Sequence, residues 1–220
     1  EIRLLSPEEL AQGIRLAWCA RILGDCEITT ETQTQAHVLG SHESLSARAP
    51  MFSRWGAAVD IGTTTLAACL YAPDGTLLAQ AGCMNPQARW GADVITRIGA
   101  ALSGDAEDLA RSVRSKVDGL LQEMAAQAGI SAGEIDAIVI TGNTAMLYLL
   151  TGTNPDCLSH APFEAERLFG ETMCGAQLEL SCVEAAVYLP RCFSAFVGAD
   201  TATALLASGI AEKSGTRLLA

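Results

Sequence analysis

The sequence has no apolar run near the roughly 18 residues that a membrane-spanning helix requires. Only 5% of its 220 residues are aromatic, and 14 Lys and Arg face 25 Asp and Glu, for a net charge of −11. A chain with this excess of negative charge repels a phosphate backbone. We therefore expect neither membrane insertion nor binding to nucleic acid.

The eight cysteines form no C-x-x-C pair, and the residues that follow Glu1 lack the apolar stretch typical of a secretion signal. Scattered cysteines of this kind are typical of buried, reduced thiols in a cytoplasmic protein, and we assign that role to all of them except Cys19. Half of the residues are apolar and the mean hydropathy is +0.26, which indicates a chain that forms a core. Because the sequence begins at Glu1 without Met, we expect a preceding segment.

The hydrophobic pattern predicts a mixed α/β domain over residues 55–212. An antiparallel meander is predicted over 55–60, 64–72 and 76–83, helices over 91–101 and 105–128, and buried strands over 134–141 and 183–189, each followed by a further helix. Asp105 is predicted to cap the second helix and Gly129 to end it. The order βββαβαβα predicts a mixed five-stranded sheet with helices on both faces. Before this domain, Ser6 and Pro7 predict a helix to about Ala20, and the polar residues 32–54 predict a linker.

Three small polar turns follow the strands that can run parallel, if the connections are right-handed crossovers. Parallel strands share an edge at their carboxyl ends, where open α/β sheets bind ligands. We therefore expect the three turns to converge. The residues at issue are Asp60, Gly62, Thr63, Thr64 and Thr65 in the first turn, Gly142, Asn143 and Thr144 in the second, and Gly198, Asp200 and Thr201 in the third.

The first turn, Asp-Ile-Gly-Thr-Thr-Thr, suits a phosphate. Gly62 lets backbone N–H groups approach an anion, the threonine hydroxyls add donors, and Asp60 can hold Mg²⁺ through water. Each turn also has a plain structural interpretation. The first is a common hairpin turn, Asn143 can be a helix N-cap, and Asp200 can be an acid favoured by the helix dipole.

Several runs together resemble known proteins: AVDIGTTTLAACLY, NPQARWGADVITRI, TGNTAMLYLLTGTNP, APF and FVGADTATALLASG. The overall pattern resembles the first, ribonuclease-H-like lobe of the actin, sugar-kinase and heat-shock-chaperone ATPases. More closely, it resembles the ATP-dependent reductive activators of corrinoid proteins. The runs cover most of residues 55–210.

That resemblance implies ATP and Mg²⁺ at the turns, with Asp60 and Asp200 as catalytic residues and Asp200 positioning water or sensing the γ-phosphate. It implies a [2Fe-2S] domain that ends in residues 1–31, a linker over 32–54, the first ATPase lobe over 55–212 and the start of a second lobe at 213–220. A family cluster cysteine follows Arg-Leu-Ala directly, whereas here Trp18 intervenes before Cys19. Cys19 then needs a local rearrangement to bind iron.

The implied activity is the return of inactive cobalt(II) corrinoid proteins to cobalt(I), with electrons from a donor that reaches the ferredoxin domain. The partners are a corrinoid protein or its methyltransferase, and a homodimer is left open. We expect the isolated 220 residues to be inactive. Two alternatives stand beside this interpretation: a sugar or small-metabolite kinase in which Asp200 is the base, and a non-catalytic interaction module.

Overall fold

The computed structural model describes residues 7–12 and 52–209. The chain divides into two compact units, residues 1–34 and 35–220. In the first unit, helix α1 (Pro7–Ala11) begins at the proline that the sequence predicts as its start. Most of the further course predicted for this helix, to about Ala20, lies outside the described residues, as do Cys19 and most of the predicted linker. In the described ranges, no helix combines the length and the apolar character needed to cross a membrane.

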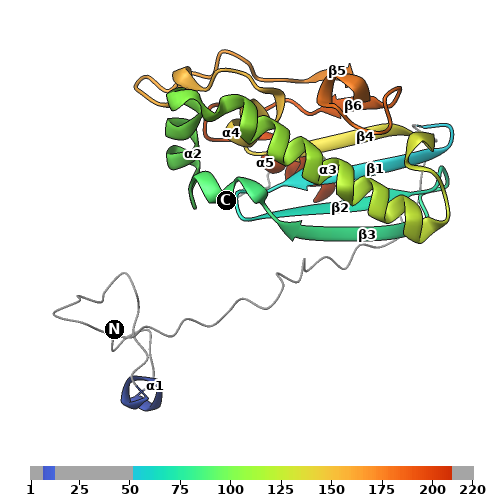
Figure 1. The fold of residues 1–220 in the computed structure, drawn as a ribbon, viewed down its shortest axis with the longest axis horizontal. Coiled ribbons are helices and arrows are strands. Elements are labelled where there is room, and N and C mark those ends of the chain that lie inside the picture. Colours follow the sequence, from blue (N-terminus) through green and yellow to red (C-terminus); the bar gives the residue numbers. More distant parts are fainter. Residues whose placement is uncertain (1–6, 13–51, 210–220) are drawn as a thin grey trace. The chain divides into compact units, whose positions relative to one another are not determined.

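The second unit contains a six-stranded mixed sheet of order β3-β2-β1-β4-β6-β5 (Figure 1). Its strands are β1 (Trp55–Ile61), β2 (Thr65–Tyr71), β3 (Leu77–Met84), β4 (Ile135–Gly142), β5 (Glu171–Cys174) and β6 (Ala186–Leu189). The β1–β4 and β4–β6 pairs are parallel, and the β1–β2, β2–β3 and β5–β6 pairs are antiparallel. The carboxyl ends of β1, β4 and β6 therefore share one edge.

Strand β5 is absent from the five-stranded sheet that the sequence predicts. It is four residues long, lies at the edge of the sheet and is mostly exposed. A short exposed edge strand needs no alternation of apolar and polar residues, so its sequence carries no strand signal. Strand β6 is also shorter than predicted, because only Ala186–Leu189 of the apolar run 183–189 pairs in the sheet.

The larger helices of this unit lie between the strands along the chain or, in the case of the last helix, after the last strand. They are α2 (Val94–Ala100), α3 (Ala106–Ala128), α4 (Thr144–Thr151) and α5 (Ala199–Ala207), with a π-helical turn η3 (Ala101–Asp105) between α2 and α3 and short 3₁₀ turns η2 (Pro86–Trp90), η4 (Ala132–Glu134), η5 (Asp156–Leu158) and η6 (Gly175–Leu178). The predicted cap at Asp105 is wrong in one respect: the residue precedes α3, but its side chain makes no capping bond, since η3 already leads into the helix. Gly129 ends α3 in the left-handed conformation, as predicted.

Helices cover both faces of the sheet. Residues Ala57, Val59 and Ile61 of β1 are buried on the face that α3 covers, whereas Asp60 points to the other face. On that second face, the Thr141 hydroxyl of β4 lies 3.3 Å from the Thr203 hydroxyl of α5. Figure 1 shows α3 in front of the sheet and α5 behind it. The six apolar residues predicted for the buried side of α3 are all buried: Leu109, Val113, Val117, Leu120, Leu121 and Met124.

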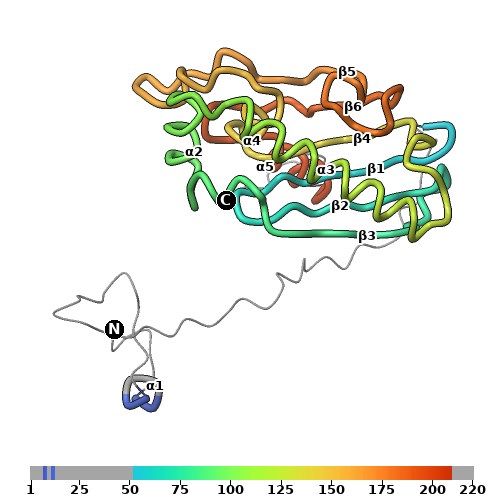
Figure 2. The backbone as a smooth tube through the Cα atoms, in the orientation of Figure 1, coloured from blue at the N-terminus to red at the C-terminus, as the bar shows by residue number. Residues whose placement is uncertain are grey.

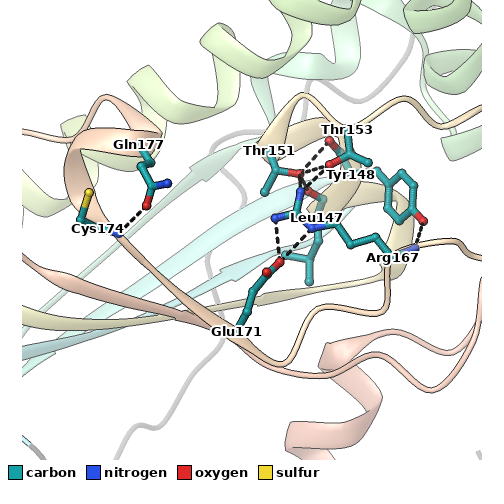
Figure 3. A network of polar contacts seen from close by, with 8 residues as sticks. All are labelled: Leu147, Tyr148, Thr151, Thr153, Arg167, Glu171, Cys174 and Gln177. Carbon is teal, nitrogen blue, oxygen red and sulfur yellow. Dashed lines mark hydrogen bonds and ion pairs between the residues drawn. The ribbon is translucent and has the colours of Figure 1, made fainter.

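The irregular segment between α4 and β5 passes along the edge of the domain (Figure 2). A polar network fastens it to α4 (Figure 3). The Arg167 N–H donates to the Tyr148 hydroxyl over 2.7 Å, and the Arg167 guanidinium binds the Thr153 hydroxyl at 2.7 Å and Glu171 at 2.6 Å. Burial raises the pKa of Tyr148 to about 12, so its hydroxyl remains a neutral partner. The network fixes the carboxyl-terminal end of α4, the helix that Asn143 caps at its start.

Candidate functional site

The turn between β1 and β2 lies at the carboxyl end of β1 and closes tightly. The Gly62 N–H donates to the Thr65 carbonyl over 2.9 Å, and a Cβ on Gly62 would lie 2.8 Å from the same oxygen. This close approach explains the glycine. Within residues 52–209, the N–H groups of Thr63 and Thr64 make no hydrogen bond, so two backbone donors are available to a ligand.

The second turn lies directly against the first. Asn143 caps α4, because its Oδ1 accepts from the Met146 N–H over 3.0 Å, and its Nδ2 donates to the Thr63 Oγ1 over 3.2 Å. Since that oxygen accepts from Asn143, the Thr63 hydroxyl keeps its own proton for another acceptor, such as a phosphate oxygen. A Cβ on Gly142 would lie 2.7 Å from the Ile61 carbonyl oxygen, so a side chain there would push the two turns apart.

Thr144 differs from its neighbours. Its side chain is fully buried, and its hydroxyl donates to the Ser194 carbonyl over 2.6 Å. The hydroxyl is thus used within the fold, where it joins α4 to the segment that leads into α5. The nucleotide contact predicted at Thr144 could therefore involve only the backbone of this residue, because its hydroxyl is already bonded.

The third turn packs onto the second. A Cβ on Gly198 would overlap the Asn143 Cα and lie 2.8 Å from the Asn143 carbonyl carbon. Helix α5 starts at the next residue, so this contact sets where its first turn lies. Asp200, in that first turn, is half-buried, and its Oδ1 accepts from the Thr201 N–H over 2.7 Å. The structure therefore brings together the three turns that the sequence predicts to converge.

Two carboxyl groups meet at this edge. Partial removal from water raises the pKa of Asp60, and the negative charge of Asp200 raises it further. Across residues 52–209, neither carboxylate has a Lys or Arg within salt-bridge distance. Two acids at one edge of the sheet, without a cation paired to either, are a donor set that fits Mg²⁺ bound through water and phosphate oxygens.

The raised pKa of Asp60 predicts that its negative charge, which the proposed metal site requires, lowers the stability of the fold at neutral pH. The folded state holds the Asp60 proton more tightly than the unfolded chain does, so this contribution to stability is complete at low pH and is lost as the pH rises through the folded pKa. At neutral pH without Mg²⁺, Asp60→Asn should therefore raise the melting temperature, by about 1–3 °C. Thermal unfolding in the presence of a chelator measures this.

Asp74, in the β2–β3 turn, is the matched control. Hydrogen bonds from Thr76 lower the pKa of Asp74, so its charge stabilises the fold above the unfolded pKa. Asp74→Asn should lower the melting temperature at neutral pH. A lower melting temperature for both variants would contradict the repulsion between Asp60 and Asp200.

The cysteines of the described region are free thiols. Cys69, Cys182 and Cys192 are buried as predicted, and burial raises the pKa of each thiol. The prediction of burial is wrong for Cys174, which lies on the exposed strand β5. In the ranges 7–12 and 52–209, no group of three or more His, Cys, Asp or Glu side chains could hold a metal.

Two side chains that touch the first turn were not among the predicted site residues. Asn85 Nδ2 donates to the Gly62 carbonyl over 2.8 Å, and Arg97 Nη2 donates to the Thr63 carbonyl over 2.7 Å. Both belong to the run NPQARWGADVITRI. The run contributes to the resemblance, but its spacing gives no sign that it folds back beneath a turn more than 20 residues earlier.

A sheet of this order, with helices on both faces and three polar turns at one edge, defines a ribonuclease-H-like lobe of the actin-like ATPase type. The family model described as the RACo middle region matches residues 55–213. The chain therefore belongs to the RACo family, of which it contains the middle region.

Individual relatives agree with this assignment. The corrinoid activation enzyme RamQ of Eubacterium limosum is 31% identical over 160 residues, which are 69% of this chain and 26% of the relative. A solved structure described as a reductive activator for corrinoid, iron-sulfur protein is 30% identical, has a TM-score of 0.71, and matches over 73% of this chain and 26% of its own. The chain thus spans about a quarter of the length of these relatives.

Proposed function

We propose that this chain supplies the first nucleotide-binding lobe of an ATP-dependent reductive activator, which returns cobalt(II) corrinoid proteins to cobalt(I). Membership of the RACo family and the names of the two relatives support the reaction. The observation that carries the proposal is the meeting of Asp60, Thr63, Asn143 and Asp200 at one edge of the sheet.

In this proposal the first turn binds the triphosphate. The free N–H groups of Thr63 and Thr64 donate to phosphate oxygens, together with the hydroxyl of Thr63. Asp60 holds Mg²⁺ through water, and the bound ion would neutralise phosphate charge. Asp200 orients the attacking water or senses the γ-phosphate. The same carboxylate would serve as the base in a sugar kinase, so the site alone is compatible with both reactions.

We further propose the domain order that the resemblance implies. Residues 1–31 end a [2Fe-2S] domain, residues 32–54 link it to the lobe over 55–212, and residues 213–220 begin a second lobe. One electron from the reduced cluster then converts cobalt(II) to cobalt(I). Cys19 is the proposed iron ligand in this chain. It lies outside the described residues.

ATP can drive this reaction only by changing the population of protein conformations. A nucleotide that binds two states equally well shifts neither, so the state competent for electron transfer must bind ATP more tightly. The phosphate turn and α5 meet at Asn143, and phosphates bound to Thr63 could therefore influence the position of α5. This contact supports a coupling that begins at the nucleotide.

The test uses the complete gene product and a purified cobalt(II) corrinoid protein. With Mg-ATP and a reductant, we expect visible absorption spectra to show ATP-dependent formation of cobalt(I). Thr63→Val removes a hydroxyl with little change of shape and should slow both ATP hydrolysis and cobalt(I) formation by at least ~10-fold. The control is Thr76→Val, at the opposite end of β2, which should leave both rates unchanged.

Cobalt(I) formation that does not depend on ATP would refute the proposal. Phosphorylation of a sugar hydroxyl would favour the kinase. Binding of a corrinoid protein without any hydrolysis would favour the interaction module.

A further inference from the structure

Arg97 of α2 is a fully buried cation with an unusual set of partners. Its side chain has no exposed surface, and its nitrogens donate to two carbonyl oxygens, that of Gly91 at 2.9 Å and that of Thr63 at 2.7 Å. A third contact joins Nη1 to the Met146 sulfur at 3.6 Å. Within residues 52–209, no carboxylate lies at salt-bridge distance from Arg97.

Three carbonyls of the first turn, those of Gly62, Thr63 and Thr64, are held by residues of one run of the chain. Asn85 binds two of them, that of Gly62 through Nδ2 at 2.8 Å and that of Thr64 through its own N–H at 2.8 Å. Arg97 binds the one between them, that of Thr63. Three successive carbonyls therefore have fixed directions.

These directions determine where the free N–H groups point. The peptide bonds of this turn are trans, and a trans peptide places its C=O and N–H on opposite sides. The Thr63 N–H therefore points away from Asn85, and the Thr64 N–H points away from Arg97. Both donors are aimed outward because the run that contains Asn85 and Arg97 holds the carbonyls from behind.

Helix α4 completes the support. The Met146 sulfur contacts both Asn85 Nδ2, at 3.8 Å, and Arg97 Nη1, at 3.6 Å. The Met146 N–H in turn binds Asn143, whose other amide atom binds the Thr63 hydroxyl. The turn is thus held by side chains from the start of η2, from α2 and from the start of α4.

The carboxylate that acts on this charge, that of Asp93, lies beyond salt-bridge distance, so the buried guanidinium has no direct ionic partner and its retention needs a further reason. An anion on the other side of the Thr63 peptide would provide one, since the intervening protein screens charge poorly. We propose that Arg97 is a positioning residue for the triphosphate: it orients the Thr63–Thr64 peptide and places a positive charge behind it. This inference rests on the proposed function and adds a residue to its site.

The test compares two buried arginines in the complete gene product. Arg114 is also buried and also donates to a backbone carbonyl, that of Leu150 at 2.8 Å, but it pairs with Glu179 and does not contact the turn. Arg97→Met should raise the dissociation constant for Mg-ATP at least ~10-fold and change that for AMP less than twofold, because AMP lacks the outer phosphates. Arg114→Met should change neither constant, although both substitutions lower the melting temperature.

Arg97→Lys keeps the charge and can still donate from its single nitrogen, so it should recover at least half of the lost affinity on a logarithmic scale. If Arg97→Met does not fold, Arg97→Gln replaces it, with the same loss expected for Mg-ATP and not for AMP. Equal weakening of Mg-ATP and AMP, or unchanged Mg-ATP binding, would overturn the role of Arg97. If the wild-type protein binds no Mg-ATP, or Asp60→Asn binds it normally, the proposed function itself fails.

Discussion

Asp60→Asn should abolish Mg-dependent ATP hydrolysis by the complete gene product, with a loss of at least ~100-fold. The substitution keeps the size of the side chain and removes the charge that would hold Mg²⁺. Its neighbours in the sheet, Ala67 and Thr141, have no charge to replace it. Phosphate release measured at saturating ATP checks the expectation, and the fold should remain intact because the substitution also relieves repulsion from Asp200.

The control for this loss is the Asp74→Asn variant, which removes a carboxylate from the turn at the other end of β2. Its hydrolysis rate should match that of the wild type. Asp60→Ala and Thr63→Ala should also lose hydrolysis with the fold retained. Unchanged activity in both of these alanine variants would remove the phosphate site from the first turn.

Gly198→Ala should disrupt the site through packing, because it removes none of the side chains proposed to bind nucleotide but crowds the turn that carries Asn143. The added methyl would overlap the Asn143 Cα, and a backbone atom cannot rotate out of the way as a side chain can. Helix α5 must therefore move away from the second turn and take Asp200 with it. We expect a destabilisation of about 1–3 kcal/mol and a loss of ATP hydrolysis of at least ~10-fold.

Gly175→Ala is the control that separates a loss of stability from a loss of nucleotide binding. Its methyl would overlap the carbonyl oxygen of Cys182, near the amino-terminal end of β6 and thus away from the site. This variant should lose stability and keep its affinity for Mg-ATP when assayed below its melting temperature. An equal loss of affinity in both glycine variants would mean that the contact between Gly198 and Asn143 has no specific role.

The sequence predicts the parts of the fold whose residues form an apolar run or follow a helical period. The meander and β4 are apolar runs bounded by turn signals and α3 keeps a 3.6-residue period, so their bounds agree with the structure to within about two residues. The exposed strand β5 has no such repeat and was missed. The cap at Asp105 was predicted from a residue type, and the π-helical turn before α3 removes the need for it.

In the candidate site, too, the sequence predicts some features and not others. The three turns could be placed at one edge because parallel strands share an edge, which is a property of topology. The commitment of the Thr144 hydroxyl to Ser194 and the contacts of Arg97 depend on tertiary packing between segments 34 or more residues apart. Local sequence does not encode such contacts, although Asn85 and Arg97 stood in a run that already contributed to the resemblance.

The central claim is that Asp60, Thr63, Asn143 and Asp200 form one triphosphate site. The most direct measurement is a crystal structure of the complete gene product with Mg²⁺ and a non-hydrolysable ATP analogue. The account predicts phosphate oxygens within hydrogen-bond distance of the Thr63 and Thr64 N–H groups and the metal beside Asp60. Phosphates bound at any other face of the sheet, with the first turn free of ligand, would contradict it.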